Sequence, residues 1–269
     1  MEGCIMPQYV SSAAITCMAV SCFAGAAIPV GLFLFFRRKM KAETLPFFVG
    51  CAIFIIFVGL ESILVNLLLS SPVGVVITTS TALMALVGGL LPGLFEETGR
   101  LVAYRTVLKN KLHNDANALM YGAGHGGVEA LAILVVSMLY NLAFAITINR
   151  GGIDTLTAGL AGTELAQLEA QLSVLTTTPA WHFLLGIVER IFAVAAHLGF
   201  SVMVWFGVKQ RKASLYLLAV ALHAVMDAVT VVMTQAGLSP IVEEIIVGVM
   251  AAGVVVLGHK IWQRYAAKA

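Results

Sequence analysis

The sequence predicts an all-α fold, a polytopic bundle of transmembrane helices, and two observations lead to this prediction. Hydrophobic residues make up 60% of the chain and charged residues 11%, whereas soluble domains carry roughly 25% charged residues. Apolar stretches of about 20 residues recur along the chain, and each is long enough to cross about 30 Å of hydrocarbon as a helix. We therefore predict a single integral membrane domain over residues 1–269 and exclude a soluble globule.

About seven stretches meet this length requirement. They run from Tyr9 to Phe36, Phe47 to Leu69, Val73 to about Val107, Ala116 to Ile148, Trp181 to Val208, Ala213 to Met233 and Ile241 to Trp262. The first is longer than the core of a signal peptide, lacks a basic start and is followed by positive charge, so it is interpreted as a span.

The third and fourth stretches exceed the length that a span requires. Pro92-Gly93 in the third and the glycine run Gly122 to Gly127 in the fourth could break or kink these helices, which would give eight spans. Irregular backbone at membrane depth is tolerated only against protein or water. Such breaks are therefore candidate site positions.

Basic residues fall on one side of the predicted bundle if the spans alternate. Lys and Arg accumulate in short cytoplasmic loops. Here they follow the first, third, fifth and seventh spans: Arg37, Arg38, Lys39, Lys41, Arg105, Lys109, Lys111, Lys209, Arg211, Lys212, Lys260, Arg264 and Lys268. The opposite loops contain Arg150 and a segment, Gly151 to Thr178, that could form a short amphipathic helix. We predict a multi-pass membrane protein, surrounded by lipid, with its N-terminus outside and its C-terminus cytoplasmic. No basic stripe of the kind that binds nucleic acid is present.

Ionisable residues inside the spans are few, and each is costly unless it has a partner or a function. They are Glu61, Glu96, Glu97, Arg100, His125, Glu129, Glu189, Arg190, His197, His223 and Asp227. One acid and three histidines, from four different spans, lie nine to eleven residues from the predicted cytoplasmic ends, or roughly 14 to 17 Å deep: Glu96, His125, His197 and His223. This shared depth predicts one polar site, with its motifs within residues 95–130 and 189–227.

Spacing along each helix suggests which of these groups act together. Glu129 follows His125 by four residues and Asp227 follows His223 by four, so each histidine has a carboxylate on its own helix face that could orient it. Glu61, by contrast, is more simply explained as a structural partner, and Glu189 with Arg190 as a buried ion pair.

The Glu-Glu-x-x-Arg pattern supplies two carboxylates with separate directions. Side chains at adjacent helical positions diverge by about 100°, so one of Glu96 and Glu97 can face water while the other pairs with a cation. Arg100 follows Glu96 by four residues and could neutralise or orient it. The glycines around His125 either leave room for a substrate strand or pack helices closely, and both interpretations stay open.

Carboxylates beside histidines in a low-dielectric pocket support two kinds of hydrolysis. In the first, His and carboxylate ligands hold Zn²⁺ and a glutamate takes a proton from the attacking water. In the second, which needs no metal, a glutamate activates the water directly and an imidazole stabilises the oxyanion. The same polar cluster could instead form the ion pathway of a proton- or metal-ion-coupled transporter, or hold together a non-catalytic scaffold.

Four motifs resemble the YhfC family of bacterial intramembrane peptidases. They are Phe95 to Arg100, Gly122 to Ala130, Glu189-Arg190 with His197, and His223 to Asp227, of which the glycine-rich second motif is the most specific. That family is distantly similar to the CAAX prenyl proteases, the bacteriocin-processing enzymes and the PrsW-type proteases. The resemblance implies a location in the bacterial plasma membrane and hydrolysis of a peptide bond within that membrane, in a hydrophobic or membrane-anchored substrate.

The resemblance also implies roles for individual residues. Glu96 would activate the water, His125 would be the histidine of the second motif, and His223 with Asp227 would form the third. Asp227 replaces the Asn that is usual in the CAAX group, and the arginine comes one residue earlier than in that pattern. His197 has no counterpart there and is taken as a third metal ligand beside His125 and His223, with zinc as the expected ion. The sequence leaves the metal-free mechanism and the oligomeric state open.

Overall fold

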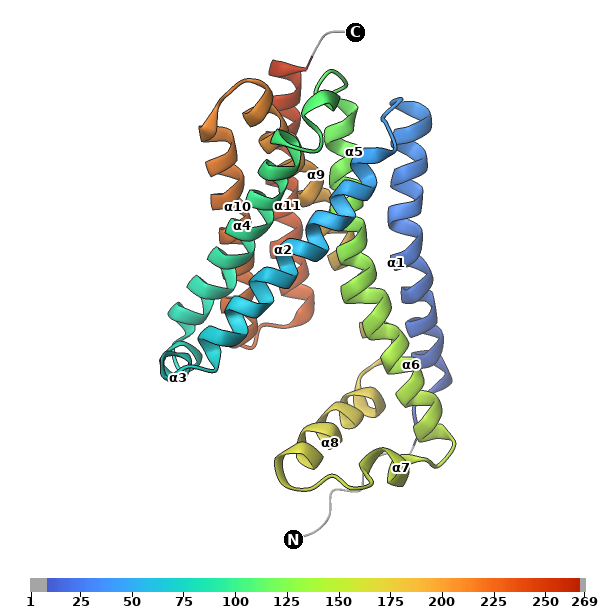
Figure 1. Cartoon of the computed structure of the whole chain (residues 1–269). Coiled ribbons are helices and arrows are strands. Elements are labelled where there is room, and N and C mark those ends of the chain that lie inside the picture. The colour runs from blue at the N-terminus through green and yellow to red at the C-terminus, as the bar shows by residue number, and fades with distance from the viewer. Residues whose placement is uncertain (1–8, 267–269) are drawn as a thin grey trace. The chain divides into compact units, whose positions relative to one another are not determined.

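The structure is a computed structural model that describes residues 9–266. Within these residues the chain is helical and contains no strand. Among the helices of residues 9–266, six are long and apolar enough to cross a membrane, or seven if α3 (Pro72–Thr78) and α4 (Thr81–Arg105) are counted as one span bent by 106°. The predicted all-α, polytopic membrane fold is therefore confirmed (Figure 1).

The remaining elements follow the predicted stretches closely. They are α1 (Ser12–Lys39), α2 (Leu45–Leu69), the 3-10 turn η1 (Lys109–Lys111), α5 (Ala116–Ala130), the π-helical turn η2 (Leu131–Val135), α6 (Val136–Asn149), α7 (Ile153–Thr157), α8 (Gly162–Thr177), the 3-10 turn η3 (Ala180–Leu184), α9 (Leu185–Lys209), α10 (Ala213–Gln235) and α11 (Pro240–Tyr265). The segment expected to form one amphipathic helix forms two, α7 and α8.

The helix breaks lie at positions other than those predicted. Helix α4 continues through Pro92, and α5 continues through the whole glycine run. The third span instead bends before α4, where Ser80 adopts an extended conformation and its hydroxyl accepts a hydrogen bond from the Leu83 amide at 3.4 Å. This N-cap starts a new helix and thereby sets the bend. Neighbouring helices compensate for a proline inside a membrane helix, which explains why Pro92 leaves α4 intact.

Two compact units make up the chain. One comprises residues 1–27 and 130–190, of which the structure describes those from Tyr9 onward, and the other comprises residues 28–129 and 191–269. Both divisions at 27 and 190 fall inside helices, α1 and α9, and the third falls at the end of α5. The boundaries therefore do not coincide with linkers, and the single membrane domain stays a prediction.

The smaller unit has its own apolar core. It is formed by Val10, which precedes α1, and by residues of α1, α6, α8 and η3: Ala14, Met18, Ala145, Ile148, Leu172, Leu175 and Phe183. Two polar contacts fasten the start of α1 within this unit. The Asn149 side chain hydrogen-bonds both the amide and the carbonyl of Val10, and the Ser21 hydroxyl donates to the Phe183 carbonyl at 2.6 Å.

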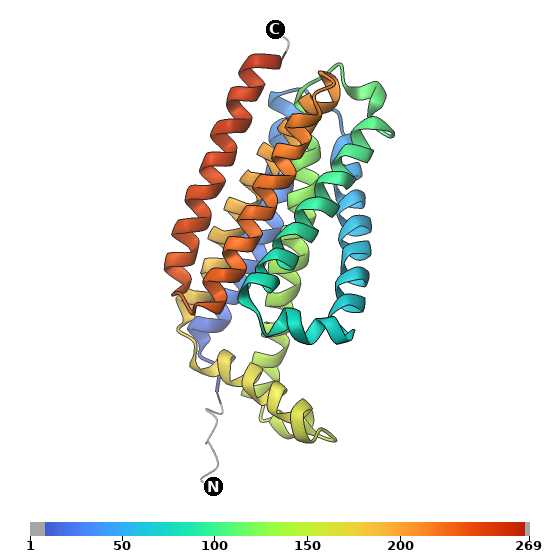
Figure 2. The same ribbon diagram turned by 90° about the vertical axis from the view of Figure 1, so that its left-hand side faces the viewer.

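The larger unit contains α2 to α5, most of α9, and α10 and α11. Figures 1 and 2 show α2 and α4 joined at one end through α3. Helix α4 packs closely on α10, because Gly89 and Gly93 lie against the backbone around Ala224. At the end where the basic loops lie, Tyr104, Tyr121 and Trp205 are fully buried and Tyr104 contacts both other rings edge-on.

Polar contacts tie the loops of this end together. Lys111 forms an ion pair with Glu43, and the Asn117 side chain bridges Glu43 to the same loop. The hydrogen bond from Lys111 lowers the pKa of the Glu43 carboxyl. At the start of α5, Asp115 accepts hydrogen bonds from the Trp205 indole at 3.0 Å and from Lys209 at 2.6 Å. These contacts fix where α5 begins beside α9, and thus the height of the histidine that each helix carries.

Candidate active site

The two carboxylates of α4 have different surroundings. The Glu97 side chain is fully buried, whereas 10% of the Glu96 side chain remains exposed. Glu97 accepts from Arg100 and also hydrogen-bonds the Nδ1 atom of His223 at 2.9 Å. Both of these contacts use its Oε1 atom. Of the pair, Glu96 is therefore the more accessible carboxylate, and Glu97 is held in place by its two partners.

Arg100 is the cation of this pair, but it contacts a different glutamate from the one we predicted. It forms an ion pair with Glu97, three residues before it, and not with Glu96. Positions three and four residues apart are both neighbours on a helix face. Glu96 instead contacts His125, whose Nε2 atom lies 2.9 Å from the Glu96 Oε2 atom. The spacing along α4 allows Arg100 to pair with either glutamate, and the contacts from neighbouring helices determine that it pairs with Glu97.

His197 lies between a cation and a carboxylate. Its Nδ1 atom is 3.2 Å from an Arg100 nitrogen, and its Nε2 atom is 2.5 Å from the Glu129 carboxylate. Because a guanidinium only donates hydrogen bonds, Nδ1 accepts and the ring proton of neutral His197 lies on Nε2. Glu129 therefore orients His197 on α9, and not His125 on its own helix as predicted.

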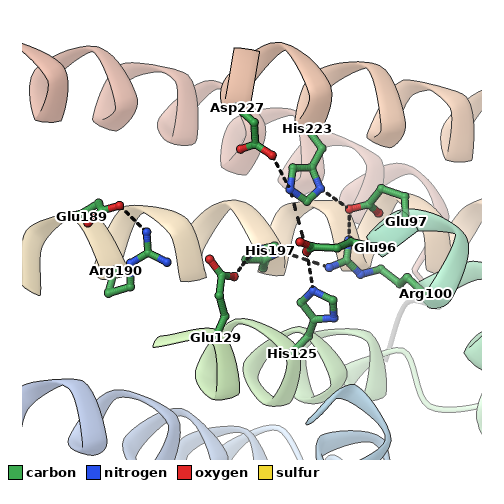
Figure 3. Close-up of polar contacts among 10 residues, drawn as sticks. All are labelled: Glu96, Glu97, Arg100, His125, Glu129, Glu189, Arg190, His197, His223 and Asp227. Atoms are coloured by element: carbon green, nitrogen blue, oxygen red, sulfur yellow. Dashed lines mark hydrogen bonds and ion pairs between the residues drawn. The ribbon is translucent and has the colours of Figure 1, made fainter. Parts of the chain in front are cut away.

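His223 has a carboxylate at each ring nitrogen. Nδ1 contacts Glu97, and Nε2 lies 3.4 Å from Asp227 and 4.0 Å from Glu96 (Figure 3). The contact with Asp227 is the one predicted from the four-residue spacing. Only the imidazolium form can donate to carboxylates from both nitrogens. Phe200 stacks on this ring at a centroid separation of 4.9 Å.

Four helices meet at this cluster, as their shared depth led us to expect. Hydrogen bonds join α4 to α5 through Glu96 and His125, α4 to α9 through Arg100 and His197, and α4 to α10 through Glu97 and His223. All of these residues belong to the larger unit. This network contains the residues predicted to take part in catalysis, which are Glu96, Glu97, Arg100, His125, Glu129, His223 and Asp227. It also contains the predicted metal ligands His125, His197 and His223.

Three of these side chains have the arrangement of a metal site. Glu96, His125 and His197 each offer one ligand atom, and these atoms all lie within 4.8 Å of one another. All three residues are buried. The sequence grouped His125 and His197 with His223, whose nitrogens here face Glu97 and Asp227. The donor set in the described structure is thus one carboxylate and two imidazoles.

Comparison with known proteins bears on this site. A sequence profile of the YhfC intramembrane metalloprotease family matches residues 24–250. The chain belongs to this family. It is also 33% identical, over 248 residues, to an uncharacterized membrane protein YhfC of Bacillus subtilis (strain 168), and the matched region covers 90% of this chain and 94% of that protein. No solved structure matches the chain.

The family match spans every residue of the polar cluster, including the glycine run. Of the two interpretations of these glycines, helix packing agrees with the structure. A Cβ at Gly124 would lie 1.9 Å from the Phe47 carbonyl oxygen of α2, and one at Gly126 would lie 3.2 Å from His197 of α9. The run therefore lets α2 and α9 approach α5 closely, and its space is filled by these helices.

Other residues around the imidazoles were missed in the sequence. Phe54 contacts the His125 ring edge-on at 5.2 Å, and Tyr121 stacks beside it at 6.0 Å. Tyr121 lies four residues before His125 on α5, so the helical period could have predicted that the two side chains are neighbours. Phe54 lies on another helix, and its position could not be inferred from spacing.

The residues predicted to have structural roles are placed as follows. Glu61 of α2 lies near enough to Glu96 and Asp227 to interact with them electrostatically. Glu189 and Arg190 form the ion pair expected from their adjacency, with the Arg190 side chain buried and that of Glu189 41% exposed. Glu61 thus lies close to the polar cluster.

Proposed function

We propose that this chain is an intramembrane endopeptidase that hydrolyses a peptide bond in a hydrophobic or membrane-anchored substrate, using zinc. The observation that supports the proposal most directly is the buried group of Glu96, His125 and His197. Two imidazoles and one carboxylate are a donor set that catalytic zinc sites use, with a further position left for water or substrate.

The residues around this group also suit a zinc ion. Metal-binding histidines commonly donate their second ring N–H to a carboxylate, which fixes the tautomer. Glu129 can do this for His197, because the ring proton on Nε2 faces it. The lone pair on Nδ1, which here accepts from Arg100, would exchange that donor for the metal. When bound, zinc lowers the pKa of a coordinated water and polarises the scissile carbonyl.

The chain itself must supply proton transfer. Glu129 contacts His197 but is not itself one of the three candidate metal ligands. Its side chain is 13% exposed. We assign Glu129 the role of the general base that takes a proton from the attacking water. His223 is assigned the donor role toward the developing oxyanion or the leaving amine, because Glu97 and Asp227 hold its ring and favour a donor at both nitrogens.

A metal-free mechanism assigns the work differently. Glu96 would then take the proton from water, as the resemblance implies. Its partial exposure and its 2.9 Å contact with His125 support this role. The two mechanisms therefore differ in whether Glu96 holds a metal or acts as the base, and this difference can be measured.

Metal analysis of the purified protein tests the zinc site. We expect near-stoichiometric zinc in the unaltered protein and in His223→Ala, and its loss in His125→Ala/His197→Ala. Circular dichroism of each variant controls for folding. Zinc lost equally in His223→Ala would restore the three-histidine set, and no zinc in any folded sample would favour the metal-free mechanism.

Carboxamide variants separate the two assignments of the base. A mixture of labelled transmembrane peptides in liposomes serves as substrate, with cleavage products identified by mass spectrometry. The zinc mechanism predicts that Glu129→Gln keeps zinc but loses activity by 10²-fold or more, whereas Glu96→Gln loses zinc as well. Glu189→Gln, outside the cluster, is the control and should remain active. Full activity in a folded Glu96→Gln variant would contradict both mechanisms.

A further inference from the structure

A cavity of about 480 Å³ lies in the larger unit beside α9. Four residues of α9 line it at helical spacing: Ala195, Leu198, Gly199 and Val202. The end of α1, Leu119 of α5 and one face of α11 complete the lining. We call this cavity the α9–α11 pocket.

The α9–α11 pocket is separated from the catalytic cluster by the body of α9. His197 points toward the cluster (Figure 3). At about 100° per residue, its side chain projects roughly 150° away from the mean direction of the four lining residues. A peptide bond in this pocket could not reach the reactive groups, so its occupant is not the scissile segment.

The lining favours a hydrocarbon chain. It consists of apolar side chains and glycines, with His259 as its ionisable member. His259 is exposed, as is 41% of the neighbouring Val255, so the pocket is open along α11. Trp262 lines the same side, and tryptophan is enriched where a membrane meets water.

Positive charge surrounds the end of the pocket that α1 forms. Phe36 and Met40 both line the pocket, and the three residues between them are exposed cations in the last turn of α1. Lys39 follows Phe36 by three residues and so projects from a neighbouring position on the same side of the helix. An anionic headgroup at this end would have Lys39 on the α1 side and the His259 imidazole on the α11 side.

We propose that the α9–α11 pocket binds one acyl chain of an anionic phospholipid, whose phosphate is held by Lys39 and His259. Basic pockets between transmembrane helices on the cytoplasmic side characteristically bind such headgroups. The occupant is a membrane phospholipid and not a lipid anchor of the substrate, because the pocket faces away from His197. The site goes beyond the proposed peptidase function and does not depend on it.

Filling the pocket tests the acyl-chain site. The full chain in detergent is titrated with phosphatidylglycerol and, separately, with phosphatidylcholine, and retained lipid is counted by native mass spectrometry. Val255→Trp should lose bound phosphatidylglycerol. Val256→Trp, at the adjacent position, where 54% of the valine is exposed outside the pocket lining, should retain it. Equal retention by the two folded variants would overturn the proposal.

Charge removal tests the headgroup site without altering the apolar lining. Lys39→Gln/His259→Gln should bind phosphatidylglycerol about fivefold or more weakly, the factor expected for losing one cation near an anionic surface. Arg38→Gln/Arg264→Gln removes exposed cations that lie outside the lining on the same two helix ends and should bind normally. Equal affinity of the unaltered protein for phosphatidylglycerol and phosphatidylcholine would refute selection for an anionic lipid.

Discussion

Adjacent glutamates on α4 can serve separate roles because they point into different surroundings. Glu97 is enclosed by Arg100 and His223, so its charge is compensated and its position fixed. Glu96 keeps some exposure and meets the histidines that carry ligand atoms. The pair thus combines a fixed anchor with the carboxylate to which both proposed mechanisms assign a chemical role. Substituting either residue should have different consequences, structural for one and chemical for the other.

Arg100 should be the most important single cation for stability. Arg100→Gln leaves the fully buried Glu97 without its guanidinium partner and removes the donor to His197. Breaking one side of a buried ion pair typically costs about 3–5 kcal/mol. We expect a strongly lowered thermal midpoint in detergent, measured by circular dichroism, whereas Arg105→Gln, an exposed cation in the last turn of α4, should change stability by no more than about 0.5 kcal/mol.

A double variant separates charge from packing in this prediction. Glu97→Gln/Arg100→Gln replaces the ion pair with two neutral amides, so no buried charge is left uncompensated. It should therefore be more stable than Arg100→Gln alone. If Arg100→Gln unfolded at the temperature of the unaltered protein, the pair would contribute nothing and the assignment of Arg100 as an anchor would be wrong.

At the scale of elements, the position of His125 depends on the contact between α2 and α5. The helices cross with Gly50 against the Tyr121 carbonyl and Gly124 against the Phe47 carbonyl, so a Cβ at either glycine would overlap backbone atoms. Backbone cannot move aside as a flexible side chain can. Because Gly50 and Gly124 have no side chains, α2 and α5 can approach this closely. Their separation in turn determines the position of His125, which follows Gly124.

Gly124→Ala tests this contact. The added Cβ would lie 1.9 Å from the Phe47 oxygen, so α2 and α5 must separate, which should cost at least about 1–3 kcal/mol. Gly59→Ala on α2 is the matched control, since nothing lies within 4 Å of its Cβ, and it should stabilise the helix by up to about 1 kcal/mol. Thermal unfolding of both variants gives the measurement. A Gly124→Ala variant as stable as Gly59→Ala would show that the helices do not require this close approach.

The sequence predicted the elements well because two strong physical signals determine them. Length of apolar stretch located the helices, and depth along each helix identified the residues that would meet. The pairings within the cluster were predicted less well, since Arg100 can reach Glu96 or Glu97 by spacing alone, and Glu129 was assigned to the wrong histidine. These choices depend on rotation and crossing of helices, which a periodic pattern does not record. The bend before α4 depends on the N-cap at Ser80. In the sequence this serine is a weaker indication of a helix break than Pro92, where the break was expected.

At the scale of the whole molecule, the distribution of charge predicts how the chain lies in the membrane. The basic loops, the buried aromatic core and the Glu43–Lys111 and Asp115–Lys209 contacts all belong to one end of the larger unit. The loops at the other ends of these helices carry few cations. Under the positive-inside rule the basic end faces the cytoplasm, and labelling can test this directly.

Single cysteines in opposite loops should react from opposite sides of the membrane. The background has all four native cysteines replaced by alanine. Asn110→Cys lies within the basic turn η1 and Gln235→Cys lies at the end of α10, both at exposed positions. In intact cells a membrane-impermeant maleimide should label only Gln235→Cys, and both should react after permeabilisation. The reverse pattern would invert the orientation. Labelling of both in intact cells would indicate mixed topology, and the asymmetry of Lys and Arg would then not determine how this chain inserts.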